Sequence, residues 1–208
     1  MKKLGLVIII LGVVVALGWW WQRSKIKEKE VEITEPVVTT GLSEEIKEKG
    51  ETMTADKTAV IYFSATGNTK KAAEMAAAIT GGDLIEIVPV EEYTQADLNW
   101  HDEQSRSSKE MKDEMARPVI RPIDDLSVYS RVILGSPIWW GLCPRVINSM
   151  IESSDLADKE IHLLITSGSS GVEEALETLK KQYPALNIVD GKRYNGGGKE
   201  ELAAWLTK

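Results

Sequence analysis

The stretch YFSATGNTKKAAEMAA, residues 62–77, passes from an apolar run through six small or hydroxyl-bearing residues into an alanine-rich pattern. The apolar run begins at Thr58 and predicts a buried strand. The alanine-rich part places its apolar side chains on one face of a helix: Ala72, Met75, Ala76 and Ile79. The stretch therefore predicts a strand, a short loop and a helix in direct succession.

The loop between this strand and helix consists of Ser64, Ala65, Thr66, Gly67, Asn68 and Thr69. Hydroxyl groups and free backbone N–H groups at the start of a helix, where the helix dipole is positive, favour the binding of a phosphate group. The loop lacks the lysine of a nucleoside triphosphate-binding loop and the G-x-G-x-x-G pattern of a dinucleotide-binding loop. It therefore predicts a site for a single phosphate monoester, with ordinary helix capping as the alternative.

Four more apolar runs predict strands, at residues 84–88, 131–135, 160–166 and 187–189. Helical patterns lie between or after them, at residues 106–115, 145–153, 172–183 and from residue 199 onward. Strands that alternate with helices predict an α/β fold, in which helices cover both faces of a parallel sheet. The interval 91–128 is too long for a simple crossover, and we interpret it as an insertion.

Two other predicted strands also end in unusual loops. The third strand is followed by Ser136, Pro137, Ile138, Trp139, Trp140 and Gly141. Flat aromatic side chains at the ligand-binding edge of a parallel sheet suit a flat ligand, although one Trp could instead plug the end of the core. The fourth strand is followed by small residues that let a ligand approach the backbone: Ser167, Gly168, Ser169 and Gly171.

The motifs SATGNT, GSPIWWG and TSGSSG, together with the segments EEYTQADLNWHDEQSRSSKEMKDEMARP and GKRYNGGG, resemble the flavodoxin family. The resemblance extends over residues 58–205 and is strongest to small bacterial flavodoxin-like proteins. It implies a three-layer, doubly wound five-stranded sheet in the order 2-1-3-4-5, with bound FMN. The first loop would then hold the phosphate, and Trp139 or Trp140 would stack on the isoalloxazine ring. The loop from Ser167 would line the ring's other edge, and the insertion would supply its second face through Trp100 or Arg106.

The N-terminal part of the chain has a different composition. Residues 4–21 carry no charge, and as a helix their 18 residues would span roughly 27 Å, close to the thickness of a membrane core. We expect a single membrane anchor closed by the aromatic residues at 19–21, with a cleaved signal peptide as the alternative. Residues 22–56 predict a polar tether, and residues 57–208 predict one domain.

Charged residues indicate on which side of the membrane the domain lies and which partners it can bind. The lysines and arginines beside the apolar segment favour a cytoplasmic domain, whereas the resemblance implies an export signal. We expect a cell-membrane protein whose domain lies on the extracytoplasmic side. Acidic and basic residues balance over residues 1–55, so the net charge of −7 belongs to the rest of the chain. This charge disfavours nucleic acid as a partner and favours redox proteins that are basic at the contact.

Three functions are compatible with these features. The favoured one is an FMN-binding electron carrier tethered to the membrane. The second is an FMN-dependent reductase that uses NAD(P)H to reduce quinones or nitro compounds. The third is a non-redox module that has kept the fold but lost the flavin or binds another phosphate, and the intact loops at three strand ends disfavour it.

Few side chains outside the three loops suggest chemistry. His101 and His162 have no Cys or carboxylate at metal-ligand spacing, so we expect structural roles and no metal site. Cys143 precedes Pro144 at a predicted helix start, so it is either a reactive thiol with a lowered pKa or a small packed residue. We expect no catalytic side chain, because the flavin would carry the redox chemistry.

Overall fold

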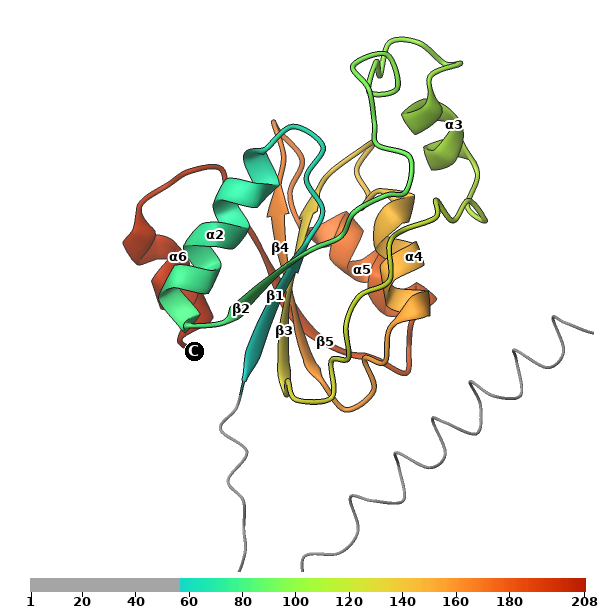
Figure 1. The fold of residues 1–208 in the computed structure, drawn as a ribbon. Coiled ribbons are helices and arrows are strands. Elements are labelled where there is room, and N and C mark those ends of the chain that lie inside the picture. Colours follow the sequence, from blue (N-terminus) through green and yellow to red (C-terminus); the bar gives the residue numbers. More distant parts are fainter. Residues whose placement is uncertain (1–56) are drawn as a thin grey trace, which may run out of the picture. The chain divides into compact units, whose positions relative to one another are not determined.

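The computed structural model describes residues 57–208, which form a five-stranded parallel sheet in the order β2-β1-β3-β4-β5 (Figure 1). The strands are β1 (Thr58–Tyr62), β2 (Asp83–Glu86), β3 (Arg131–Pro137), β4 (Glu160–Thr166) and β5 (Asn187–Arg193). The helices are α2 (Asn68–Thr80), α3 (Arg106–Lys112), α4 (Arg145–Ser153), α5 (Glu173–Gln182) and α6 (Lys199–Leu206). The predicted doubly wound fold and strand order are confirmed.

The predicted anchor at residues 1–21 and the predicted tether at residues 22–56 lie outside the described residues. Of the helices within residues 57–208, none combines the length and apolar character needed to cross a membrane.

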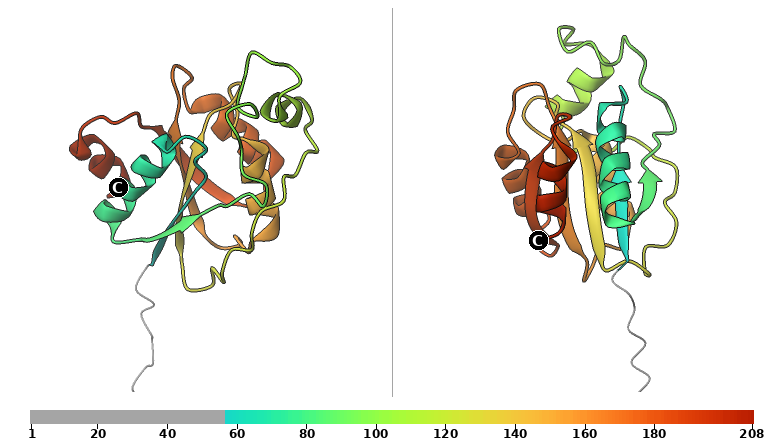
Figure 2. Two further views of the ribbon diagram at one scale, coloured as in Figure 1. Left: turned by 45° about the horizontal axis from the view of Figure 1, so that its top comes forward. Right: turned by 90° about the vertical axis from the view of Figure 1, so that its left-hand side faces the viewer.

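Helices cover both faces of the sheet. In Figures 1 and 2, α2 and α6 lie on one face, and α4 and α5 lie on the other. Alternate residues of β1 supply the two cores, because successive side chains of a strand point to opposite faces. Val60 and Tyr62 pack with α2 and α6, whereas Ala59 and Ile61 pack with α4 and α5. The central strands are therefore apolar on both sides, as a fully covered parallel sheet requires.

Several elements end at other residues than predicted: β2 ends at Glu86 instead of residue 88, and β3 ends at Pro137 instead of residue 135. The ends of β5 and α3 differ most. Strand β5 continues to Arg193 instead of residue 189, because it pairs with β4 through backbone hydrogen bonds that do not depend on apolar side chains. Asp190 and Lys192 interrupt the apolar pattern, and the pairing shifts by one residue between Ile188 and Asp190 but continues to Arg193. Helix α3 ends at Lys112, because Asp113 has an extended backbone.

The insertion between β2 and β3 is tied to the body at its base. Val90 N donates to Val119 O at 2.8 Å, and Arg121 N donates to Val88 O at 2.8 Å, which closes an antiparallel stem. Helix α3 lies beyond this stem, at the end of the molecule where the strands finish (Figure 1). The insertion thus adds structure at the edge of the sheet that binds ligands in folds of this kind.

His162 joins three elements inside the domain. Its ring nitrogens lie 2.6 Å from Glu160 Oε1 and from Asp190 Oδ1, and Trp205 Nε1 donates to Asp190 Oδ2 at 3.0 Å. These contacts connect β4, β5 and α6. Within residues 57–208, no cluster of three or more His, Cys, Asp or Glu side chains is arranged to hold a metal ion.

Candidate functional site

A cleft of about 980 Å³ lies at the carboxyl ends of the strands. Most of the residues predicted for the site line it: Ala65, Thr66, Asn68, Thr69, Pro137, Ile138, Trp139, Trp140, Ser167 and Gly168. Trp100 and Ser107 of the insertion also line it. Three loops that are distant in the sequence therefore meet at one cavity, whose volume is at the upper end of the roughly 300–1,000 Å³ usual for ligand sites.

The start of α2 has the features of an anion site. Gly67 precedes the helix with φ of 84°, and no side chain caps the helix there. The N–H groups of a first helical turn have no partner within the helix, and the dipole makes this end positive. No acidic residue lies in that turn, whereas Lys71 lines the cleft. The N-terminal end of α2 can therefore bind the phosphate group of a ligand in the cleft.

The first and third loops are fixed relative to each other. Thr69 Oγ1 and Thr166 Oγ1 are 2.8 Å apart in the interior, so a hydrogen bond joins the start of α2 to the end of β4. After β4, Ser167 N donates to Asn195 Oδ1 at 3.0 Å, and the Arg193 guanidinium donates to Gly168 O at 2.9 Å. The segment after β5 thus holds the small-residue loop against the cleft.

The two tryptophans of the second loop have different surroundings. The Trp139 ring packs edge-on against Phe63 and Tyr93, with centroid distances of 5.9 and 5.2 Å. Trp139 is therefore part of an aromatic cluster that closes the end of the core, while one side of it still lines the cleft. Trp140 lines the cleft with 49% of its surface exposed.

Trp140 lies in an unusual backbone conformation. Trp139 N donates to Leu142 O at 2.8 Å, and Leu142 N donates to Trp139 O at 3.0 Å. Between them, Trp140 and Gly141 have φ values of 48° and 84°, which is the pattern of a type I′ turn. Asn, Asp or Gly usually occupies the first central position of such a turn, because the left-handed conformation costs other residues about 1–2 kcal/mol. An aromatic side chain is thus held at the cleft in a conformation that disfavours it.

Some predicted residues support the site without lining the large cleft. Ser64 lies at a smaller cavity of about 220 Å³, and its buried hydroxyl has no hydrogen-bond partner among the described residues. Ser136 is buried, and its hydroxyl donates to Pro137 O at 2.7 Å. Gly141 has a φ of 84°, a conformation in which any other residue would be strained, so glycine is required for the turn.

The other predicted residues outside the lining are Gly67, Ser169 and Gly171. Gly67 acts through its backbone, as the residue that starts α2. Ser169 and Gly171 are exposed and lie farther along the third loop, where the backbone turns toward α5.

Arg106 does not line the cleft, so its predicted direct contact with a ligand is not supported. Its guanidinium instead lies over the Tyr93 ring, 4.1 Å from the centroid, and Arg106 Nε donates to Glu110 Oε1 at 2.7 Å. Of the two residues proposed for the insertion, only Trp100 reaches the cavity.

Cys143 is a packed residue, and the reactive-thiol alternative is wrong. Its side chain is buried in the core against α4, and this burial raises the pKa of the thiol to about 11. A thiol with that pKa is almost entirely protonated at neutral pH, whereas the thiolate is the reactive form.

Several lining residues were not predicted. Lys71 and Met75 lie one and two turns into α2, on the face that carries Asn68, so helical periodicity could have found them. Tyr194 and residues 195–197 line the cleft directly after β5. The sequence prediction ended this strand too early, and so it did not bring the loop to the ligand-binding edge.

The lining determines which chemistry the cleft can support. Among the described residues that line it, Lys71 and Tyr194 are the only ones with titratable side chains, and none is a carboxylate, imidazole or thiol. The cleft therefore offers an anion site and aromatic surfaces rather than a general acid or base. The uncapped start of α2 and the exposed indoles of Trp100 and Trp140 fit a phosphorylated ligand with a planar ring.

Comparison with known proteins gives consistent matches. Residues 57–208 match the family model described as Flavodoxin. The crystal structure of a candidate flavoprotein from Bacteroides uniformis is 44% identical, with a TM-score of 0.71, over 73% of this chain and 98% of that chain. A candidate flavoprotein from Bacteroides eggerthii has the same identity and TM-score, over 73% and 96% of the two chains.

A flavoprotein from Lactobacillus acidophilus, solved in complex with FMN, is 21% identical with a TM-score of 0.60. The match covers 74% of this chain and 100% of that chain, and at this identity it shows a shared fold. No curated protein sequence matches the chain.

Proposed function

Because the chain belongs to the flavodoxin family, we propose that its cleft binds FMN and that the protein carries electrons between redox partners. The start of α2, with Thr66 and Asn68, would hold the phosphate, while Trp140 would stack on the ring. FMN, when bound, supplies the exchange of one or two electrons. The protein's part is to bind the cofactor, orient it and exclude water.

The observation that carries this proposal is the left-handed conformation of Trp140. A half-exposed tryptophan in a type I′ turn contributes little to folding, since the turn would be more stable with Asn or Gly. Backbone strain of this kind clusters at functional sites, where the surrounding structure enforces it. A planar ligand that stacks on the indole gives the strained residue a role.

Electron transfer is favoured over substrate reduction by the lining of the cleft. Two indoles, Trp100 and Trp140, reach the cavity from different segments, and both are exposed. If they cover the two faces of the ring, only its edge stays accessible, which suffices for electron transfer but not for hydride transfer from a nicotinamide.

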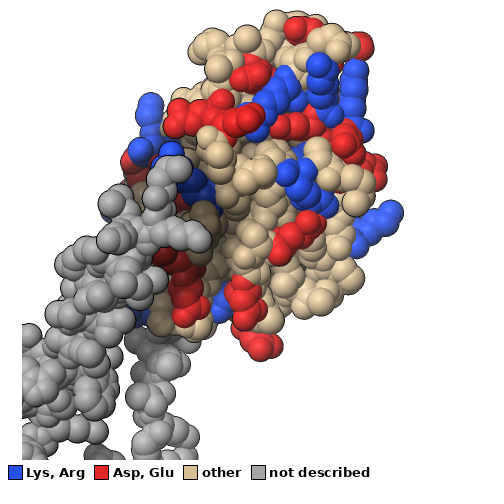
Figure 3. Space-filling model, turned by 45° about the vertical axis from the view of Figure 1, so that its right-hand side comes forward, with Lys and Arg blue, Asp and Glu red and all other residues tan. Residues whose placement is uncertain are grey.

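The charge distribution is compatible with a protein partner. Figure 3 shows acidic and basic side chains interspersed over one side of the molecule, with no continuous basic patch on it. Together with the net charge of −7, this supports the proposal that redox partners are basic at the contact and that nucleic acid is not a ligand.

Location at the membrane is a further part of the proposal, supported by the apolar segment at residues 4–21. Strand β1 begins at the end of the sheet opposite the cleft, because all strands run in parallel and the cleft lies at their carboxyl ends. We propose that the domain lies on the extracytoplasmic side.

The cofactor is tested by titrating the flavin-free protein with FMN, FAD and riboflavin while recording visible absorption. FMN is expected to bind tightly, and the other two weakly. Thr66→Val removes a hydroxyl with little change of shape, so it should weaken FMN binding about tenfold or more, as loss of a hydrogen bond to a charged group does, and leave riboflavin unaffected. Thr178→Val, on α5, is the control. Failure of the wild type to bind FMN would exclude the proposal.

Replacing Trp140 should change the stability of the protein and its affinity for FMN in opposite directions. Trp140→Asn is expected to raise the free energy of unfolding of the flavin-free protein by up to about 1 kcal/mol, because Asn tolerates the left-handed conformation. The same variant should weaken FMN binding about tenfold through loss of the stacking surface. Urea unfolding and flavin titration measure the two effects. The control is Asp158→Asn, at a residue with a left-handed backbone outside the cleft, and it should change neither the free energy of unfolding nor the FMN affinity. A destabilised Trp140→Asn variant with normal FMN affinity would contradict the role of Trp140.

Carrier and reductase differ in their kinetics. The FMN-loaded protein should oxidise NADH or NADPH, with a quinone as acceptor, far more slowly than the roughly 1–10³ s⁻¹ typical of enzymes. After chemical reduction it should pass electrons to a basic c-type cytochrome, at a rate that falls as salt screens the attraction. Rapid turnover with a nicotinamide cofactor would instead identify a reductase.

The membrane proposal is tested by fractionating cells that express either the full chain or a chain that starts at residue 57. The full chain should remain with membranes and keep residues 1–21 in its intact mass, whereas the shorter chain should be released. Protease added outside the sealed membrane should digest the domain. A mature protein that begins after residue 18 would show a cleaved signal peptide, and protection from protease would show a cytoplasmic domain.

A further inference from the structure

The insertion brings an exposed aromatic side chain to the cleft on a loop. We call residues 94–105 the Trp100 loop; it carries Leu98 and Trp100 into the lining, and Trp100 is 66% exposed. A loop holds a side chain in one position only when its ends are fixed by packing and hydrogen bonds. The contacts at the two ends of this loop are therefore informative.

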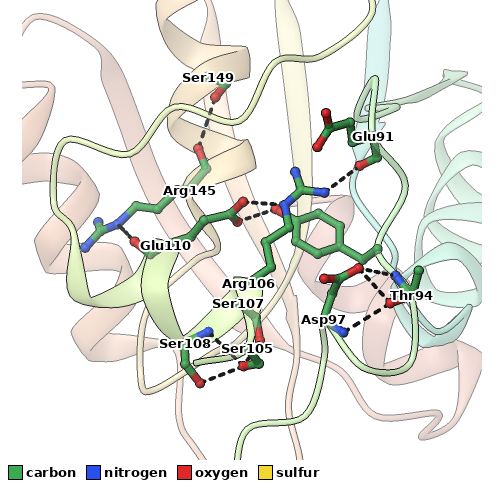
Figure 4. A network of polar contacts seen from close by, with 11 residues as sticks. Glu91, Thr94, Asp97, Ser105, Arg106, Ser107, Ser108, Glu110, Arg145 and Ser149 are labelled. Carbon is green, nitrogen blue, oxygen red and sulfur yellow. Dashed lines mark hydrogen bonds and ion pairs between the residues drawn. The ribbon is translucent and has the colours of Figure 1, made fainter. Parts of the chain in front are cut away.

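The two ends of the Trp100 loop meet each other (Figure 4). Tyr93 directly precedes the loop and Arg106 directly follows it, and the guanidinium lies 4.1 Å from the centre of the phenol ring. Inside the loop, Thr94 N donates to Asp97 Oδ2 at 2.8 Å. From α3, Ser107 N donates to Asp97 O at 3.0 Å. The loop is thus closed at its base.

Glu110 connects both ends through one carboxylate. Tyr93 Oη donates to Glu110 Oε2 at 2.5 Å, and Arg106 Nε donates to Glu110 Oε1 at 2.7 Å. Arg106 Nη1 also donates to Glu91 O at 2.8 Å. The Arg106 and Glu110 side chains are only 22% and 14% exposed, so solvent screens this pair less than a surface ion pair. Burial and the hydrogen bond to Glu110 raise the pKa of Tyr93 far above its ordinary value, so the phenol keeps the proton that it donates.

This Tyr93–Arg106–Glu110 cluster, which we call the latch, is attached to the rest of the site. The Tyr93 ring packs edge-on against Trp139, which itself lines the cleft. From α4, the buried Arg145 donates to Glu110 O at 3.4 Å (Figure 4). It also donates to Met111 O at 3.2 Å. The latch therefore links the insertion to the second loop and to the helix that follows that loop.

We infer that Arg106 is a positioning residue: through the latch it holds the Trp100 loop so that Trp100 covers the planar ring of the bound ligand, and Trp100 determines affinity for that ring. This inference rests on the proposed binding of FMN and adds the residues that set the ring contact. Arg106 acts without touching the ligand, because it does not line the cleft. Its planar fork makes the Glu110 and Glu91 contacts at the same time, which a lysine cannot reproduce.

The test compares Arg106→Lys, Trp100→Ala and the double variant in the purified full chain, titrated with FMN and with riboflavin. Trp100→Ala should weaken binding of both flavins about fivefold to tenfold through loss of an aromatic contact. Arg106→Lys should weaken both by a similar factor, and the double variant should be no weaker than the single ones, because both changes remove one contact. Fluorescence of the bound flavin, which a stacked indole quenches, should rise in all three variants.

The controls separate positioning from a general loss of structure. Lys112→Gln removes an exposed ion pair of Lys112 with Glu103 on the same insertion and should change neither affinity nor fluorescence. Thr66→Val should weaken FMN alone, whereas the latch variants weaken both flavins equally. Additive losses in the double variant, or normal affinity and fluorescence in Arg106→Lys, would overturn the inference while leaving FMN binding intact. A wild type that binds neither flavin would overturn both.

Discussion

The five strands of the sheet run in one direction, and the site depends on this constraint. Parallel pairing brings the ends of β1, β3, β4 and β5 to one edge, so the loops that follow these strands meet there although they are far apart in the sequence. The same pairing buries the central strands on both faces, which makes them rigid supports. Loop residues such as Thr66 and Ser167 are therefore placed by strands of which only the last residues, Pro137 of β3 and Thr166 of β4, reach the cleft.

At this edge of the sheet, the adjacent residues Trp139 and Trp140 have different roles. Trp139 closes the core by packing on Phe63 and Tyr93, and this packing fixes the start of the turn that carries Trp140. The turn holds Trp140 in the left-handed region, where the backbone alone would favour a smaller residue. The energy of the aromatic cluster thus offsets strain at the neighbouring residue, a distribution typical of ligand sites.

Much of this arrangement was predictable from local patterns. Alternating apolar runs and helical faces predicted the strands and helices, and the loop at residues 64–69 predicted an anion site because a helix begins there. The polar end of β5 was missed, since pairing with β4 rather than apolar side chains extends that strand. For the same reason the lining by Tyr194 was missed. The sequence left open whether Trp100 or Arg106 faces the ligand, because the contacts of Arg106 with Tyr93 and Glu110 are defined by the fold of the insertion.

The sequence by itself determined the class of fold, the three loops and the kind of ligand that they suit, because helix dipoles, glycine turns and apolar periodicity act over a few residues. Only the tertiary structure decided which of the two adjacent tryptophans is packed and which is exposed, that Cys143 is buried, and that the insertion contributes Trp100 rather than Arg106 to the cleft. Those outcomes depend on contacts between segments that lie far apart in the chain. No local pattern encodes such contacts, since each residue's surroundings exist only after the sheet has assembled.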